Sequence, residues 1–134
     1  MGKIVVLVDY TGNFAATPVT PEMACLSTGR TLDEVKTNLM EALQFHLEGM
    51  EEDNLPIPEE FDAPWDIDWR LTTRALLHYT EGLVSRSAIA KITGINQQQL
   101  SHYASGYRKP RPSMSLRIRE GVRKIAQALV AVTE

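Results

Sequence analysis

The chain has 134 residues, of which 43% are hydrophobic and 23% are charged, a composition typical of a globular protein with one ordinary domain or two small ones. It has no apolar run of membrane-spanning length and no signal peptide, so we expect a cytoplasmic protein with no membrane partner. The single Cys25 excludes an internal disulfide, and the scattered histidines predict neither a metal nor a cofactor.

Charge is divided unevenly along the chain. Residues 1–66 carry three cations against thirteen carboxylates, a net charge of −10, whereas residues 67–134 carry eleven cations against four carboxylates, a net charge of +7. This division indicates two partners of opposite charge, with nucleic acid the obvious partner of the basic half. Mutual neutralisation of the two halves is the alternative.

The first elements predict a small sheet. A β-branched run at residues 4–8 is typical of a buried strand, residues 9–13 form a turn, and residues 14–17 begin a second strand that prolines then break or leave at an edge. Residues 23–27 predict a third strand.

A helix follows these strands. Thr31 and Glu34 form a capping box at its start, and the helical pattern continues to about Met50. Its apolar stripe contains Leu32, Val35, Leu39, Leu43 (with Ala42), His46 or Leu47, and Met50. Three strands and then a helix predict an α+β fold in which one helix packs across a small sheet.

An acidic, proline-rich connection ends at residue 64, and the predicted domains are therefore residues 1–64 and 65–134. Residues 65–71 alternate apolar and polar side chains, which predicts a half-buried fourth strand. This strand either completes the N-terminal sheet or pairs with a second copy of the chain.

The second domain is predicted to contain a helix-turn-helix. A helix begins at residue 72 or 73, and Leu76, Leu77 and Leu83 are expected in the core. In the next helix Ile89 and Ile92 share one face, and Gly94 ends it. Asn96 and Gln99 form a capping box that starts another helix, and the inward residues of that helix are Leu100, Tyr103 and Ala104. Ser105 and Gly106 end it.

The outward residues of that last helix suit DNA, because a glutamine amide can bond to the edge of adenine in the major groove. We assign base contacts to Gln97, Gln98, Ser101 and His102. We assign phosphate contacts to Ser87, Lys91, Arg108, Lys109 and Arg111. A helical hairpin with a solvated polar face is the alternative.

A final helix is predicted from a Ser113 cap to about residue 132, with apolar positions at alternating spacings of four and three. This seam fits core packing and self-association equally well. Because DNA readers usually pair, we expect at least a dimer. The candidate interface residues are Trp65, Ile67, Trp69 and Leu71 of the strand and Ile118, Val122, Ile125 and Leu129 of the seam.

Two stretches resemble the HicB antitoxins. Residues 24–50, with the run CLSTGRTLDEVKTNLMEALQFHLEG, are similar to the strand, turn and helix of that family, and residues 53–60 are similar to the tail that follows. Residues 88–112 resemble the helix-turn-helix of phage-type repressors.

The resemblance implies a partial RNase H-like N-terminal domain followed by a DNA-binding domain. It implies an antitoxin that binds and blocks a small basic RNA-cleaving toxin, a HicA-like mRNA interferase, and that represses its own operon through operator DNA. Catalysis is not expected, because Asp9 is the only strand-end acid of the first hairpin and we interpret it as a turn residue. The alternative function is a stand-alone helix-turn-helix regulator whose N-terminal domain dimerises or senses a ligand.

Overall fold

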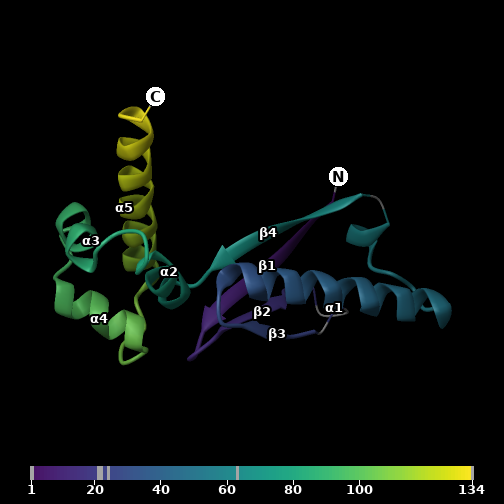
Figure 1. Cartoon of the computed structure of the whole chain (residues 1–134). Helices are drawn as coiled ribbons and strands as arrows, with labels where there is room; N and C mark the ends of the chain where they lie inside the picture. The colour runs from purple at the N-terminus through teal and green to yellow at the C-terminus, as the bar shows by residue number, and fades with distance from the viewer. Residues whose placement is uncertain (1, 21–22, 24, 63, 134) are drawn as a thin grey trace. The chain divides into compact units, whose positions relative to one another are not determined.

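The computed structural model describes residues 2–20, 23, 25–62 and 64–133. The fold is α+β, with a four-stranded mixed sheet and, within those residues, five α-helices (Figure 1). No helix in the described part of the chain is long and apolar enough to cross a membrane. The elements are β1 (Gly2–Tyr10), β2 (Phe14–Pro18), β3 (Ser27–Gly29), α1 (Leu32–Glu52), the 3-10 turn η2 (Glu59–Phe61), β4 (Trp65–Leu71), α2 (Thr73–Thr80), α3 (Arg86–Thr93), α4 (Gln97–Ser105) and α5 (Pro112–Ala131).

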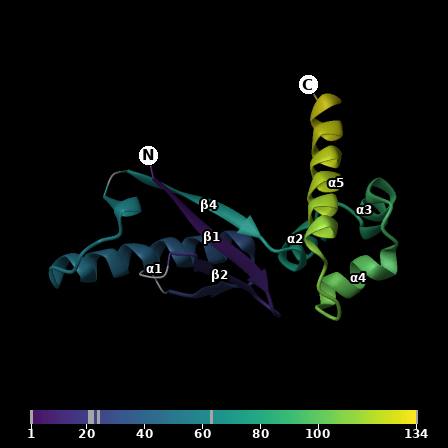
Figure 2. The same ribbon diagram turned by 180° about the vertical axis from the view of Figure 1, so that it is seen from behind.

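The chain divides into two compact units, Met1–Thr72 (unit 1) and Thr73–Glu134 (unit 2). In unit 1 the strand order is β3-β2-β1-β4. β1 pairs antiparallel with β2 and parallel with β4, whose register places Trp65 beside Gly2 and Leu71 beside Val8. Helix α1 runs along one face of this sheet, as both views show (Figures 1 and 2).

The core of unit 1 lies between α1 and the sheet. Ile4, Val6 and Val8 alternate along β1 and are fully buried, as strand periodicity requires when one face is covered. The first four residues of the predicted apolar stripe of α1 are buried, as predicted, whereas His46, Leu47 and Met50 toward its end are only half-buried. Each fully buried aliphatic side chain contributes about 1.5–3 kcal/mol to stability.

Strand β4 belongs to the N-terminal sheet, and this moves the domain boundary. The predicted boundary after residue 64 is wrong, because residues 65–71 pair with β1 along their whole length. The predicted turn at residues 9–13 is also too long. Asp9 lies within β1, where its Oδ1 accepts hydrogen bonds from the Tyr10 N–H and from the Thr72 hydroxyl, each at 2.8 Å.

The third strand is shorter and later than residues 23–27, because β3 contains only Ser27–Gly29. Its pairing with β2 places Gly29 beside Phe14 and against the first turn of α1. A Cβ at Gly29 would lie 2.6 Å from the Val35 backbone nitrogen, so this approach requires glycine. Ala24 of the predicted strand and Pro21 lie outside the described residues.

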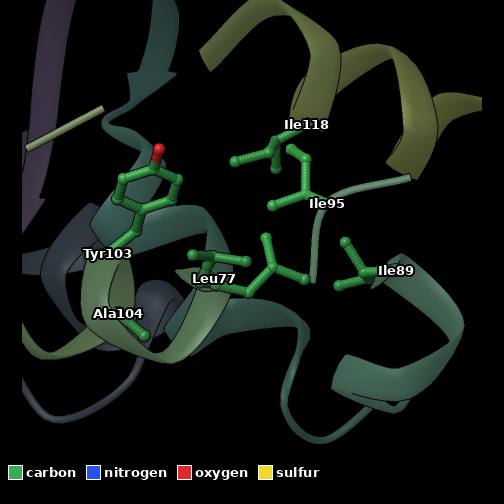
Figure 3. Close-up of a cluster of buried hydrophobic side chains, with 7 residues drawn as sticks. Leu77, Ile89, Ile95, Tyr103, Ala104 and Ile118 are labelled. Carbon is green, nitrogen blue, oxygen red and sulfur yellow. The ribbon is translucent and has the colours of Figure 1, made fainter. Parts of the chain in front are cut away.

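Unit 2 is a helical unit around one apolar cluster (Figure 3). Side chains from α2, α3, α4, α5 and the turn after α3 converge there, and Leu100 and Ile118 are fully inaccessible. The buried members are Leu77, Ile89, Ile95, Leu100, Tyr103, Ala104 and Ile118.

Several predictions for unit 2 need correction. Leu83 is 69% exposed and Ile92 is 43% exposed, so neither is a core residue. Ser113 does not cap the last helix. Arg111 is the N-cap of α5, and Pro112 occupies the first turn, where its missing N–H has no intrahelical partner to lose.

Helices α3 and α5 pack closely at Gly121. A Cβ added there would lie 2.5 Å from Thr93 Cγ2, whereas a Cβ at Gly49 of α1 would meet nothing within 4 Å. We therefore expect Gly121→Ala to destabilise unit 2 by about 1–3 kcal/mol. The matched Gly49→Ala should stabilise unit 1 by about 0.5–1 kcal/mol.

Urea unfolding distinguishes the two effects. Both tryptophans lie in unit 1, so their fluorescence reports that unit, while circular dichroism reports the helices of both units. A Gly121→Ala protein as stable as the wild type by circular dichroism would contradict the close packing.

Candidate nucleic-acid interface

Helix α4 is set by the residues at its two ends. Gly94 ends α3 at φ 73° and Gly106 ends α4 at φ 81°, a left-handed conformation that glycine adopts without steric cost. At the N-terminus of α4, Asn96 Oδ1 accepts a hydrogen bond from the Gln99 N–H at 2.7 Å. The predicted glycine stops and the Asn96 cap are confirmed.

The C-terminus of α4 is held by α2. The Ala104 carbonyl oxygen accepts hydrogen bonds from Arg74 Nε at 3.2 Å and from His78 Nε2 at 2.7 Å. The last carbonyls of a helix lack intrahelical donors and carry partial negative charge, which these side chains complement. The buried side of α4 contains Leu100, Tyr103 and Ala104, as predicted.

The outer face of α4 carries the predicted base-contacting residues. Gln97 and Gln98 are exposed, and Ser101 and His102 are half-buried. The Ser101 hydroxyl donates to the Gln97 carbonyl at 3.1 Å, and the His102 ring lies 4.9 Å from the Tyr107 ring between centroids. The two amides are therefore the more accessible groups, while the hydroxyl and imidazole also have contacts within the chain.

Gln99 has a different position from the one that the capping box predicts. Its side-chain Nε2 donates to the Tyr103 hydroxyl at 2.7 Å, which turns the amide along α4 and away from the helix start. The second hydrogen bond of the predicted capping box, between the Gln99 side chain and the Asn96 N–H, is thus replaced by a side-chain contact one turn later.

The loop between α4 and α5 borders a basic cleft. Arg108, Lys109 and Arg111 line it, and Arg117 of α5 joins them. The cleft has a volume of about 640 Å³, and Gln99, Tyr103, Ser113 and Met114 complete its lining. These lining residues include four cations and no carboxylate, so the cleft favours an anion.

Arg117 and Tyr107 are candidate contact residues that the sequence patterns missed. A Cβ at Gly94 would lie 2.9 Å from Arg117 Nη2, so this guanidinium lies against the turn between α3 and α4. Tyr107 is 73% exposed, and the Arg108 guanidinium lies 5.9 Å from its ring centroid. The YRKPR run draws attention to this loop, but only the path of α5 brings Arg117 to it.

Ser87 and Lys91 are exposed on α3, one turn apart, and neither lines the basic cleft. The structure therefore brings together three of the five predicted phosphate-contacting residues and leaves these two on a separate surface. Unit 2 as a whole has ten cations and three carboxylates, a net charge of +7. Of these carboxylates, Glu81 pairs with Arg86 at 2.8 Å.

The predicted interface residues fall into different environments. Ile118 and Ile67 are buried in the cores of their own units, which removes them as contacts for a partner. Val122 and Ile125 are half-buried against the unit 2 cluster. Leu129 is 55% exposed near the end of α5, and Trp65, Trp69 and Leu71 are half-buried.

The Cys25 thiol offers little metal or redox chemistry. Burial raises the pKa of this thiol, so it remains protonated at neutral pH. Among the described residues, no three His, Cys, Asp or Glu side chains are grouped closely enough to hold a metal ion.

The Asn96 cap generates a test of how α4 is held. Replacing Asn96 with Ala should cost about 1 kcal/mol of unit 2 stability, because the Gln99 N–H loses its acceptor. Gln98→Ala is the matched control, since this exposed residue of the same helix makes no cap. Equal unfolding midpoints for the two variants by circular dichroism would contradict the role of the cap.

No protein-family model, no curated protein and no solved structure matches this chain. The candidate interface is therefore defined by its own geometry: an exposed amide-bearing helix face and, beside it, a cleft lined by four cations.

Proposed function

We propose that this protein is an antitoxin-type transcriptional regulator that binds operator DNA through unit 2 and a small basic RNA-cleaving toxin through unit 1. The observation that carries the DNA half is the cleft with four cations beside the exposed amides of α4. The toxin half rests on the resemblance to HicB antitoxins and on the charge of unit 1.

Helices α3 and α4 have the features expected of a helix-turn-helix. α3 and α4 are short, they are joined by a turn with left-handed Gly94, and both pack on α5 and α2 through a shared core. In such a reader the second helix enters the major groove, which assigns Gln97 and Gln98 to base edges. The cleft then receives a backbone phosphate.

Unit 1 suits a basic protein partner. It carries four cations and fourteen carboxylates, a net charge of −10, which would steer a cationic toxin toward it and repel nucleic acid. A β3-β2-β1-β4 sheet with β4 parallel to β1 and one covering helix is compatible with the partial RNase H-like fold that the resemblance implies. The Asp9 carboxylate accepts hydrogen bonds from Tyr10 and Thr72, which hold the end of β1.

Base reading and phosphate binding predict different mutational effects. Gln98→Ala should cost about 1–3 kcal/mol on the cognate operator and relax specificity at one base. Lys109→Ala and Arg117→Ala should weaken operator and scrambled duplex alike and reduce the salt slope by about one each.

Titration of both duplexes at several salt concentrations separates these roles. Arg123→Ala, on the same helix as Arg117 but outside the cleft, is the matched control and should leave the salt slope almost unchanged. Equal losses on both duplexes for Gln98→Ala would remove it from the base-reading residues. If the wild type binds neither duplex, the DNA half of the proposal fails.

The end of α5 is the candidate dimer contact. Leu129, Val130 and Val132 are 55%, 71% and 79% exposed, and the last two turns of α5 carry no charged residue. An uncharged helix end with exposed aliphatic side chains is best stabilised by a second copy. Leu129→Lys should convert a dimer to monomer in sedimentation, whereas Gln127→Lys should not. A monomeric wild type at micromolar concentration would refute this assignment.

The toxin half is tested by co-expression with a small basic protein encoded beside this gene. We expect growth to be rescued and the two proteins to purify together. The minimal protein for this experiment is residues 1–72 and not 1–64, because the shorter chain lacks β4, the parallel neighbour of β1. Failure of the full-length chain to rescue growth would overturn the toxin assignment.

A further inference from the structure

A groove lies beside the β4 edge of the sheet in unit 1. It has a volume of about 390 Å³, within the range of roughly 300–1,000 Å³ that is common for binding sites. β4 supplies one wall and α1 the other. The lining residues are Lys36, Thr37, Met40 and Glu41 of α1 and Trp65, Asp66, Ile67 and Trp69 of β4.

The backbone of β4 is oriented for strand addition. Pro64 O accepts from Gly2 N at 3.2 Å and Thr72 N donates to Val8 O at 2.9 Å, so the even-numbered residues of this segment face β1. The odd-numbered residues 65, 67, 69 and 71 therefore direct their N–H and C=O groups toward the open edge. Because β4 is the last strand on its side of the sheet, this edge can pair with a further strand.

One of these edge groups is already occupied. The Asp66 carboxylate accepts a hydrogen bond from the Ile67 N–H at 2.8 Å, so this N–H is not free to pair with a further strand. A cationic side chain that paired with Asp66 would draw this carboxylate away and release the N–H for pairing. The edge thus favours a basic strand over a neutral or acidic one.

The side chains in the groove favour the same occupant. Trp65 and Trp69 are half-buried and lie on the α1 side of the sheet, and Lys36 Nζ is 5.4 Å from the Trp69 ring centroid. The Trp69 ring face can therefore hold a cation, although Lys36 occupies it in the free protein. Glu41 of α1 adds a carboxylate to the groove, and the Asp66 carboxylate lies at the β4 edge beside it.

We propose that this groove binds an extended, cationic segment of a separate basic protein, which adds to β4 as a fifth strand. Alternate side chains of the segment enter the groove between α1 and β4, because side chains of a strand alternate between faces. This inference rests on the proposed function, which assigns a basic partner to unit 1, and it names the groove as the place where that partner binds. A second copy of unit 1 is the less favourable occupant, because each copy carries a net charge of −10.

The only two tryptophans of the chain both line the groove, so their emission reports its occupancy. The probe is a six-residue peptide in which arginine alternates with valine, added to the full-length protein. We expect saturable calorimetric binding, a matching change in tryptophan emission, and slower hydrogen exchange of the Trp69 and Leu71 amides. The same peptide with alternate amides N-methylated, which cannot pair as a strand, should lose binding at least about tenfold.

Two charge reversals on α1 provide matched variants. Glu41 lines the groove, whereas Glu48 is exposed on the same helix outside it. Glu41→Lys should weaken peptide binding at least about fivefold, and Glu48→Lys by less than about twofold because of solvent screening. Both substitutions are at exposed helix positions and should leave the unfolding midpoint unchanged.

The other outcomes overturn the inference in distinguishable ways. Calorimetric binding without a change in tryptophan emission, or with equal losses for Glu41→Lys and Glu48→Lys, would place the basic partner elsewhere on unit 1 and leave the proposed function intact. Equal binding of a peptide with glutamate in place of arginine would remove the charge argument. Tryptophan emission that changes with protein concentration alone would assign the edge to a second copy. No calorimetric binding would count against both the groove and the basic partner.

Discussion

The position of α4 depends on hydrogen bonds at both of its ends. A helix of nine residues is too short to be stable in isolation, so its outer face is presented only because the rest of unit 2 holds it. Asn96 caps its first turn, and Arg74 and His78 of α2 bind the carbonyl oxygen of Ala104 near its last turn. The buried side of α4 completes this support through the apolar cluster shown in Figure 3.

Separation of charge between the two units is the second organising property of the molecule. Unit 1 carries −10 and unit 2 carries +7; the groove of unit 1 is lined by two acidic residues and one lysine, and the cleft of unit 2 by four cations. Because charge steers association before contacts form, the two units are suited to different classes of partner. This separation is what the proposed binding of a basic protein by unit 1 and of DNA by unit 2 would use.

Much of the fold follows from local sequence chemistry. Gly94, Asn96 and Gly106 were identified correctly because a left-handed turn and an N-cap each depend on one residue and its immediate neighbours. The apolar stripe of α1 was likewise readable from its helical spacing.

The errors concern contacts between distant parts of the chain. The alternation of apolar and polar residues in 65–71 predicts a strand but does not show which strand lies beside it. Neither the parallel pairing with β1 nor the later domain boundary could therefore be predicted from the sequence. The spacing of Ile118, Val122 and Ile125 is the same for a core and for a dimer seam. In the structure α5 packs so that these residues lie in or against the core of unit 2. The same path brings Arg117 to the basic cleft.

Hydrogen–deuterium exchange of the full-length protein, with and without duplex DNA from the region upstream of its own gene, tests whether unit 2 alone binds DNA. We expect DNA to slow exchange in α3, in α4 and in the loop that carries Arg108 to Arg111, while β4 and the rest of unit 1 exchange as in the free protein. Protection of unit 1 by DNA, or the absence of protection in α4, would contradict the assignment of one partner class to each unit.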